Sequence, residues 1–215
     1  MDYTFFWYLG HASTFISLIP LVLFLFIFRR LIPTQRRLTT LIVLVFVTEI
    51  TANVMWLQQL NNNPVYHIYA VLEFYMILRI FKLELNNLLS NKIFNLLIIT
   101  FFGFAIANAI WVQDVFSFNS NVTTASSLII IVLVFIYFSS LLQKESLQPL
   151  HIVPMFWIGA GMTLYYTTNL ALFFITSYEL FVFENRHTIW SIHAIVNIIL
   201  FCFYTYALWI QPKTE

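Results

Sequence analysis

Apolar stretches long enough to cross a lipid bilayer recur along almost the whole chain. Seven segments qualify, at residues 8–28, 39–59, 64–83, 93–112, 121–142, 153–175 and 188–210. A transmembrane helix needs roughly 20 predominantly apolar residues. Only 9% of the 215 residues are charged, whereas a soluble domain has about 25%. The sequence therefore predicts one all-α membrane domain over residues 1–215, built from seven transmembrane helices, with no soluble domain beside it.

The basic residues predict the orientation of this domain. With seven spans, nine of the ten Lys and Arg residues fall on one side of the membrane. They are Arg29, Arg30, Arg36, Arg37, Arg79, Lys82, Lys92, Lys144 and Lys213, whereas the other side has only Arg186. Short cytoplasmic loops are enriched in Lys and Arg. We therefore expect an outside N-terminus and a cytoplasmic C-terminus, in a bacterial cytoplasmic membrane.

The two halves of the chain contain similar segments in the same order. Residues 17–31 read SLIPLVLFLFIFRRL and residues 127–141 read SLIIIVLVFIYFSSL, which are identical at seven of fifteen positions. Further pairings set Asn53 on Asn169, Glu49 on Tyr165, Tyr66 on Trp190, Tyr69 on His193 and Glu73 on Asn197. Membrane transporters are often built from such repeats. The pattern predicts two parallel three-helix repeats, about residues 8–83 and 121–210, joined by a linker helix at 93–112.

This 3+1+3 arrangement resembles the superfamily that contains SWEET sugar transporters, PQ-loop transporters and microbial rhodopsins. The resemblance implies a transporter-like fold but rests on topology. Segment 188–210 contains no lysine, which excludes the retinal Schiff base of a rhodopsin. No Pro-Gln pair ends segment 8–28 or 121–142, and the prolines do not match the SWEET pattern. Leu72-Glu73-Phe74, together with His193-x3-Asn197, is also similar to bacterial seven-helix membrane proteins of unassigned function.

Two carboxyl groups lie inside predicted spans. Glu49 is near the middle of segment 39–59 and Glu73 near the middle of segment 64–83, with no basic residue at the same depth. An acidic side chain at mid-bilayer costs about 3 kcal/mol even on the most lenient insertion scale. Both residues are therefore candidates for a function, with their protonation state left open.

Helical spacing places aromatic and polar side chains on the same faces as these carboxyls. Residues four and seven positions apart share a helix face, and four such stripes occur in segments 39–59, 64–83, 153–175 and 188–210. The candidate ligand-binding residues are Glu49, Asn53, Trp56, Tyr66, Tyr69, Glu73, Tyr165, Asn169, Trp190, His193 and Asn197. We expect an outward-facing polar cavity between these four segments, floored by the two carboxyls. For the three asparagines, the alternative is a hydrogen bond that only joins neighbouring helices.

Other polar residues are expected outside this cavity. His67 is about 120° from Glu73 around its helix, so it should face a different neighbour. His11 and His151 should lie near the membrane surfaces. Cys202 is the only cysteine; we expect it to be buried, and it provides no Cys-based metal motif.

The first functional hypothesis is a transporter, or a transporter-derived binding protein, for a small polar solute, with Glu49 or Glu73 as a proton carrier. A membrane sensor that signals to a separate partner is the second. The third is an intramembrane metal-dependent enzyme that uses Glu49, Glu73 and His193. It resembles seven-helix hydrolases of the ceramidase and adiponectin-receptor type, which have His-x3-His where this chain has His193 and Asn197.

No resident cofactor is expected. A haem would need an axial pair such as His67 and His193, and these two histidines form only a weak pair by position. The expected partners are the lipid bilayer and a small polar ligand. A homo-oligomer or a signalling partner is left open, and nothing in the sequence supports nucleic-acid binding.

Overall fold

The described part of the chain is a bundle of helices. The computed structural model describes residues 3–143, 149–176 and 179–210, with side chains at 8–143, 149–173 and 188–210. The elements are α1 (Tyr3–Phe15), α2 (Leu18–Ile27), the 3-10 turn η1 (Phe28–Arg30), α3 (Pro33–Leu57), α4 (Asn63–Glu84), α5 (Asn91–Trp111), α6 (Ser120–Gln143), the 3-10 turn η2 (Leu150–Ile152), α7 (Pro154–Thr176) and α8 (Glu179–Trp209). The all-α class predicted from the sequence is confirmed for these residues.

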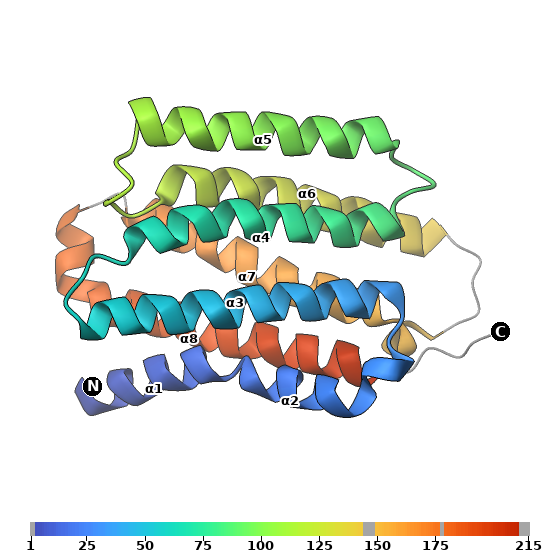
Figure 1. Ribbon diagram of the computed structural model, residues 1–215, viewed down its shortest axis with the longest axis horizontal. Coiled ribbons are helices and arrows are strands. Elements are labelled where there is room, and N and C mark those ends of the chain that lie inside the picture. The colour runs from blue at the N-terminus through green and yellow to red at the C-terminus, as the bar shows by residue number, and fades with distance from the viewer. Residues whose placement is uncertain (1–2, 144–148, 177–178, 211–215) are drawn as a thin grey trace.

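The long helices lie side by side along the longest axis of the molecule (Figure 1). Helices that follow each other along the chain pack against each other: α3 packs on α4, α4 on α5, α5 on α6, α6 on α7 and α7 on α8. The ring closes where α8 packs against α1 and α2, and α4 also contacts α6 across it. The first helix begins at one end of the bundle and α8 ends at the other (Figure 1).

Six spans of the described residues are long and apolar enough to cross a membrane. They are Tyr8–Arg30, Pro33–Leu57, Asn63–Glu84, Asn91–Trp111, Ser120–Gln143 and Thr188–Trp209. Large apolar side chains cover the outside of the bundle, among them Phe26, which is 81% exposed, and Leu142, which is 82% exposed. A continuous apolar surface of this kind fits lipid and not water. The chain is therefore an integral membrane protein.

The first span is divided into two helices, contrary to the single helix predicted at 8–28. Pro20 has no backbone N–H, and its ring would clash with the carbonyl of Ile16 in a continuous α-helix. The chain forms a tighter turn there, in which the Ile19 N–H donates to the Ile16 carbonyl at 3.1 Å. In the other predicted repeat, Ser127 lies inside the unbroken helix α6. The two aligned segments therefore differ in structure.

Three helices begin at least five residues earlier than predicted, the first being α1, which starts at Tyr3 instead of residue 8. Helix α3 starts at Pro33 instead of residue 39, since proline is favoured in the first turn of a helix. Helix α8 starts at Glu179 instead of residue 188, so most of the predicted outer loop at 176–187 is helical. Hydropathy detects only the part of a helix that is apolar enough for lipid. It therefore missed the polar first turn of α3 and the residues of α8 before the polar stretch 184–187.

Gln35 joins the start of α3 to the end of α8. Its side chain is fully buried, and Nε2 donates to the carbonyls of Ala207 at 2.8 Å, Leu208 at 3.3 Å and Ile210 at 2.8 Å. Its Oε1 accepts a hydrogen bond from the Ile32 N–H at 3.0 Å. The last carbonyls of a helix have no partner within that helix, so this one side chain caps α8.

Cys202 is exposed on α8, and the expectation that it would be buried is wrong. Its neighbours Phe201 and Tyr204 face the interior, at 1% and 2% exposure. Cys202 therefore lies on the outward side of the same helix. A thiol behaves as a small apolar group, which makes a lipid-facing position acceptable.

Candidate functional site

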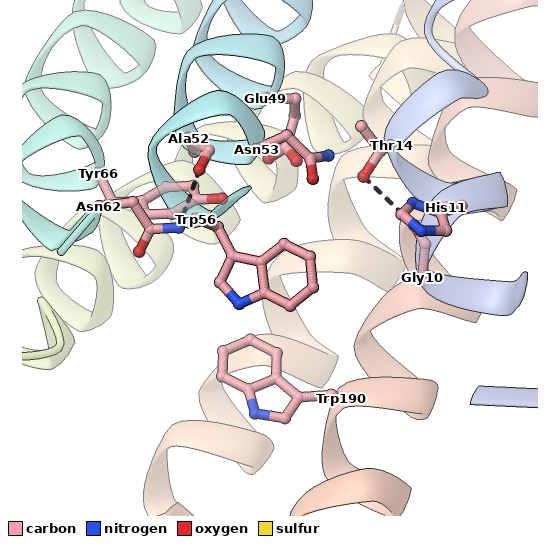
Figure 2. A pocket seen from close by; sticks show the side chains of 10 residues that line it. All are labelled: Gly10, His11, Thr14, Glu49, Ala52, Asn53, Trp56, Asn62, Tyr66 and Trp190. Carbon is pink, nitrogen blue, oxygen red and sulfur yellow. Dashed lines mark hydrogen bonds between the residues drawn. The ribbon is translucent and has the colours of Figure 1, made fainter. Parts of the chain in front are cut away.

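A pocket of about 410 Å³ lies between α1, α3, α4 and α8, at the end of the bundle where α3 ends and α4 begins (Figure 2). Its volume is in the range of about 300 to 1,000 Å³ that is typical of small-molecule sites. The lining residues are Gly10, His11, Thr14, Glu49, Ala52, Asn53, Trp56, Asn62, Tyr66 and Trp190. Eight of these ten residues have polar or aromatic side chains.

Helix α3 provides the predicted stripe of Trp56, Asn53 and Glu49. These side chains share one face of the helix, and each lies about one turn deeper in the pocket than the one before. Trp56 is 58% exposed, whereas Asn53 and Glu49 are partly buried. Glu49 precedes the last residue of α3, Leu57, by eight positions, which is about 12 Å along a helix axis. The pocket therefore has an aromatic rim on α3 and a carboxyl group well below it.

The other walls come from three helices. Figure 2 shows Tyr66 of α4 on one side of Trp56, and His11 and Thr14 of α1 across from Glu49 and Asn53. The indole of Trp190, from α8, lies next to the indole of Trp56 in this view. Trp190 is 55% exposed, so both tryptophans belong to the rim.

The structure brings five of the eleven predicted site residues to this pocket, namely Glu49, Asn53, Trp56, Tyr66 and Trp190. The cavity was expected between the second, third, sixth and seventh spans. Among the described residues, however, α7 supplies none of the lining, and α1 takes its place. Sequence reasoning missed Gly10, His11 and Thr14, although their spacing puts them on one helix face. His11 was expected only near the membrane surface.

Glu73 is held in a contact between α4 and α7. Its Oε1 accepts hydrogen bonds from the Tyr69 hydroxyl at 2.7 Å and from the Tyr166 hydroxyl at 2.9 Å. Tyr69 was predicted to share a face with Glu73, and it does. Tyr166 was missed in favour of Tyr165, because both residues are about one helical turn from Asn169.

A line of side chains runs from the rim of the pocket toward this carboxyl. The ring of Trp190 meets the ring of His193 edge to face, with centroids 5.9 Å apart. The His193 ring is 5.7 Å from Tyr165, which is 5.1 Å from Tyr166. His193 Nδ1 is also 2.9 Å from Asn169 Oδ1. Three more of the predicted site residues thus lie behind the pocket and join α7 to α8, namely Tyr165, Asn169 and His193.

Asn197 turns toward α1. Its Nδ2 donates to the hydroxyl of Ser13 at 2.9 Å and to the Ser13 carbonyl at 3.2 Å. This is the contact expected of an asparagine that joins neighbouring helices. The repeat alignment pairs Asn197 with Glu73, but these two residues make different contacts.

The remaining candidates do not form a second centre. His67 is buried, and its Nε2 lies 3.1 Å from the Ser117 carbonyl in the α5–α6 connection, so it faces a different neighbour from Glu73, as expected. In the part of the chain that the structure describes, no three His, Cys, Asp or Glu residues come together as a group that could hold a metal ion. The hypothetical metal set of Glu49, Glu73 and His193 is therefore not assembled.

The α5–α6 connection packs over the same end of the bundle. The side-chain amides of Asn61 and Asn63 both donate to the Phe116 carbonyl, at 2.7 and 2.8 Å. The Phe118 ring contacts the ring of Trp190 edge to face, with centroids 6.1 Å apart. This connection therefore supports the rim of the pocket from outside.

The chain was compared with family models, curated proteins and solved structures, and nothing matches it. The resemblance to SWEET and PQ-loop transporters gains no support from these comparisons.

Proposed function

We propose that this protein is a transporter, or a transporter-derived binding protein, that admits a small polar solute from the outer side of the membrane. The pocket carries the proposal, because it extends from two exposed tryptophans to a carboxyl group inside a membrane-spanning helix. An ionisable side chain at such a depth is costly, and it usually marks a ligand or proton pathway.

The proposal includes seven spans, with the N-terminus outside. Helix α7 has 23 residues and none of them is charged; at about 35 Å it is long enough to be the seventh span. Arg36, Arg79, Lys82 and Lys92 lie near the start of α3, the end of α4 and the start of α5. Those helix ends are opposite the end with the pocket (Figure 1). Since basic residues favour the cytoplasmic side, the pocket faces outward.

Glu49 is the proposed site of proton exchange. It lines the pocket, so a solute and a proton can both reach it, whereas Glu73 already accepts two hydrogen bonds from tyrosines. Because a carboxyl that gains or loses a proton changes its attraction for a bound solute, the two movements become coupled. The two parallel repeats remain part of the proposal, with Tyr66 and Trp190 as the matched pair that lines the pocket.

Access from outside is tested with two adjacent cysteine substitutions. Thr14 lines the pocket, and Phe15, the next residue of α1, is 47% exposed on the bundle surface. Thr14→Cys and Phe15→Cys are each made with Cys202→Ser, and intact cells are treated with an uncharged, membrane-impermeant maleimide. We expect Thr14→Cys to react and Phe15→Cys to stay unlabelled, because lipid excludes the polar reagent. Equal labelling of the two, or no labelling of Thr14→Cys, would contradict the proposal.

Proton coupling is tested by uptake into proteoliposomes. A panel of small radiolabelled solutes is offered without a proton gradient, with an inward gradient and with an outward gradient. We expect one direction of the gradient to stimulate uptake of at least one solute, and Glu49→Gln to remove this stimulation. A cation that competes with the proton for Glu49 should respond to the outward gradient. Asp114→Asn is the matched control, because Asp114 lies in the α5–α6 connection and outside the lining of the pocket. Uptake that ignores both the gradient and Glu49→Gln would refute the coupling.

A further inference from the structure

The charge of the pocket restricts which solutes it can bind. Of its ten lining residues, all within the described part of the chain, Glu49 is the only acid, none is Lys or Arg, and His11 is the one other side chain that can be basic. An anionic solute would approach a carboxyl group with no lysine or arginine beside it. Coulomb attraction between unit charges is stronger in a partly buried site than in water. The lining therefore favours a solute with a positive charge.

Aromatic rings from three helices line the pocket. Trp56, Tyr66 and Trp190 come from α3, α4 and α8, and Figure 2 shows that both indoles belong to the lining of the pocket. The face of an aromatic ring attracts cations, tryptophan most strongly, and groups of such rings bind substituted ammonium ions. Trp56 and Trp190 thus supply two such rings at the rim of the pocket.

The neutral polar groups fit the same kind of ligand. The Thr14 hydroxyl donates to the Gly10 carbonyl at 3.3 Å, and the Asn62 side-chain amide donates to the Ala52 carbonyl at 3.3 Å. Both side chains thus use a donor within the protein, and their oxygen atoms are the groups they mainly offer to a ligand. These oxygen atoms carry partial negative charge, which attracts an organic ammonium ion with or without N–H groups.

We infer that the pocket binds a small organic ammonium ion, with its cationic head between the rings of Trp56 and Trp190 and with Glu49 as the counter-charge. The inference rests on the proposed function, since the ion must enter from outside. The same chemistry occurs in a free organic ammonium ion and in the quaternary ammonium headgroup of phosphatidylcholine. The experiment below separates these two sources.

The test measures how ligands protect Thr14→Cys, in the Cys202→Ser background, from the uncharged maleimide. Three probes of similar size are compared in proteoliposomes: tetramethylammonium, tert-butanol and pivalate, which are cationic, neutral and anionic. We expect tetramethylammonium to slow the labelling in a saturable manner, and the other two to have no effect at the same concentrations. This comparison needs no change to Glu49 or to the aromatic rings.

Substitutions then identify the side chains that bind tetramethylammonium. We expect Glu49→Gln to raise the half-protecting concentration of tetramethylammonium at least tenfold. Trp56→Leu and Trp190→Leu should each raise it about 2- to 30-fold, the range expected for a cation–π contact. Asp114→Asn and Trp111→Leu are the matched controls and should leave it unchanged, because neither residue lines the pocket. Labelling without a probe shows that each variant is folded and open.

The outcomes separate the inference from the proposed function. Protection by pivalate equal to that by tetramethylammonium, or no effect of Glu49→Gln, would contradict the inference that the ligand is an ammonium ion. The proposal of a pocket open to the outside would still stand. A pocket that admits no maleimide would overturn both.

Vesicles of phosphatidylglycerol and of phosphatidylcholine are compared without added probe. Slow labelling only in phosphatidylcholine would support the inference with a lipid headgroup as ligand, and equal labelling with protection by tetramethylammonium would support a free solute.

Discussion

Tyr166 of α7 and Glu73 of α4 are joined across the bundle by a hydrogen bond of 2.9 Å between Tyr166 Oη and Glu73 Oε1. The same oxygen accepts the Tyr69 hydroxyl at 2.7 Å. Two donors stabilise a carboxyl group that would otherwise be costly inside the bilayer. Glu49 instead lines the pocket. Glu49 and Glu73 thus have different surroundings, and substitutions should affect them differently.

Glu73→Leu should destabilise the protein much more than Glu73→Gln. Leucine removes the acceptor from two tyrosine hydroxyls, of which Tyr166 is 3% exposed, at a cost of about 1 to 3 kcal/mol for each buried donor left unpaired. Glutamine keeps an acceptor oxygen in the same place. Thermal unfolding of the detergent-solubilised protein measures the difference. Tyr206→Phe is the control, since it removes a hydroxyl from a side chain that is 42% exposed. Equal losses for the two Glu73 variants would show that these hydrogen bonds do not stabilise the fold.

Gln35→Glu should be among the most destabilising single substitutions in the chain. The change replaces the amide donor with an acceptor that faces the carbonyls of Ala207 and Ile210. Both partners are then acceptors, in a buried site at the negative end of the α8 dipole. We expect a loss of about 3 kcal/mol or more, measured as a lower unfolding temperature. Gln58→Glu, at the exposed end of α3, should change it little, and a similar loss at both positions would argue against the cap.

Much of the fold could be predicted from the sequence, because hydropathy and helical periodicity are local properties. The apolar segments matched helices of the structure, with errors at their polar ends. The face of Glu49, Asn53 and Trp56 followed from spacing alone, since residues four and seven positions apart always share a helix face. A local signal was also available for the break in the first span, because Pro20 removes one backbone hydrogen bond.

The neighbours of each face could not be predicted in the same way. Spacing shows that Asn197 and His193 share a side of α8, but only packing decides that Asn197 reaches Ser13 of α1 while His193 reaches Asn169 of α7. The choice between Tyr165 and Tyr166 was likewise open, because adjacent residues differ by about 100° around the helix. The contribution of α1 to the pocket depends on the closure of the ring between α1, α3 and α8.

Gly161 should tolerate no larger side chain without loss of stability. A Cβ atom at this position would lie 2.9 Å from the Cβ of Phe203 and 3.1 Å from a methyl of Leu200, so α7 and α8 approach closely there. Small residues at such crossings allow membrane helices to pack. We expect Gly161→Ala to cost about 1 to 3 kcal/mol, measured by thermal unfolding. Gly103→Ala, where nothing lies within 4 Å of the added atom, should be neutral or slightly stabilising. Equal effects would mean that the α7–α8 contact adjusts freely.

The orientation of the protein in the membrane decides which side the pocket serves. Gln58 follows α3 at the end with the pocket, and Asn86 follows α4 at the opposite end; both are exposed. With Cys202→Ser, we expect Gln58→Cys to react with an impermeant maleimide in intact cells, and Asn86→Cys to react only after the cells are permeabilised. The physical reason is the cluster of Lys and Arg at the Asn86 end, which favours the cytoplasm. The reverse pattern would place Glu49 in a pocket open to the cytoplasm, and the ammonium ion would then enter from inside the cell.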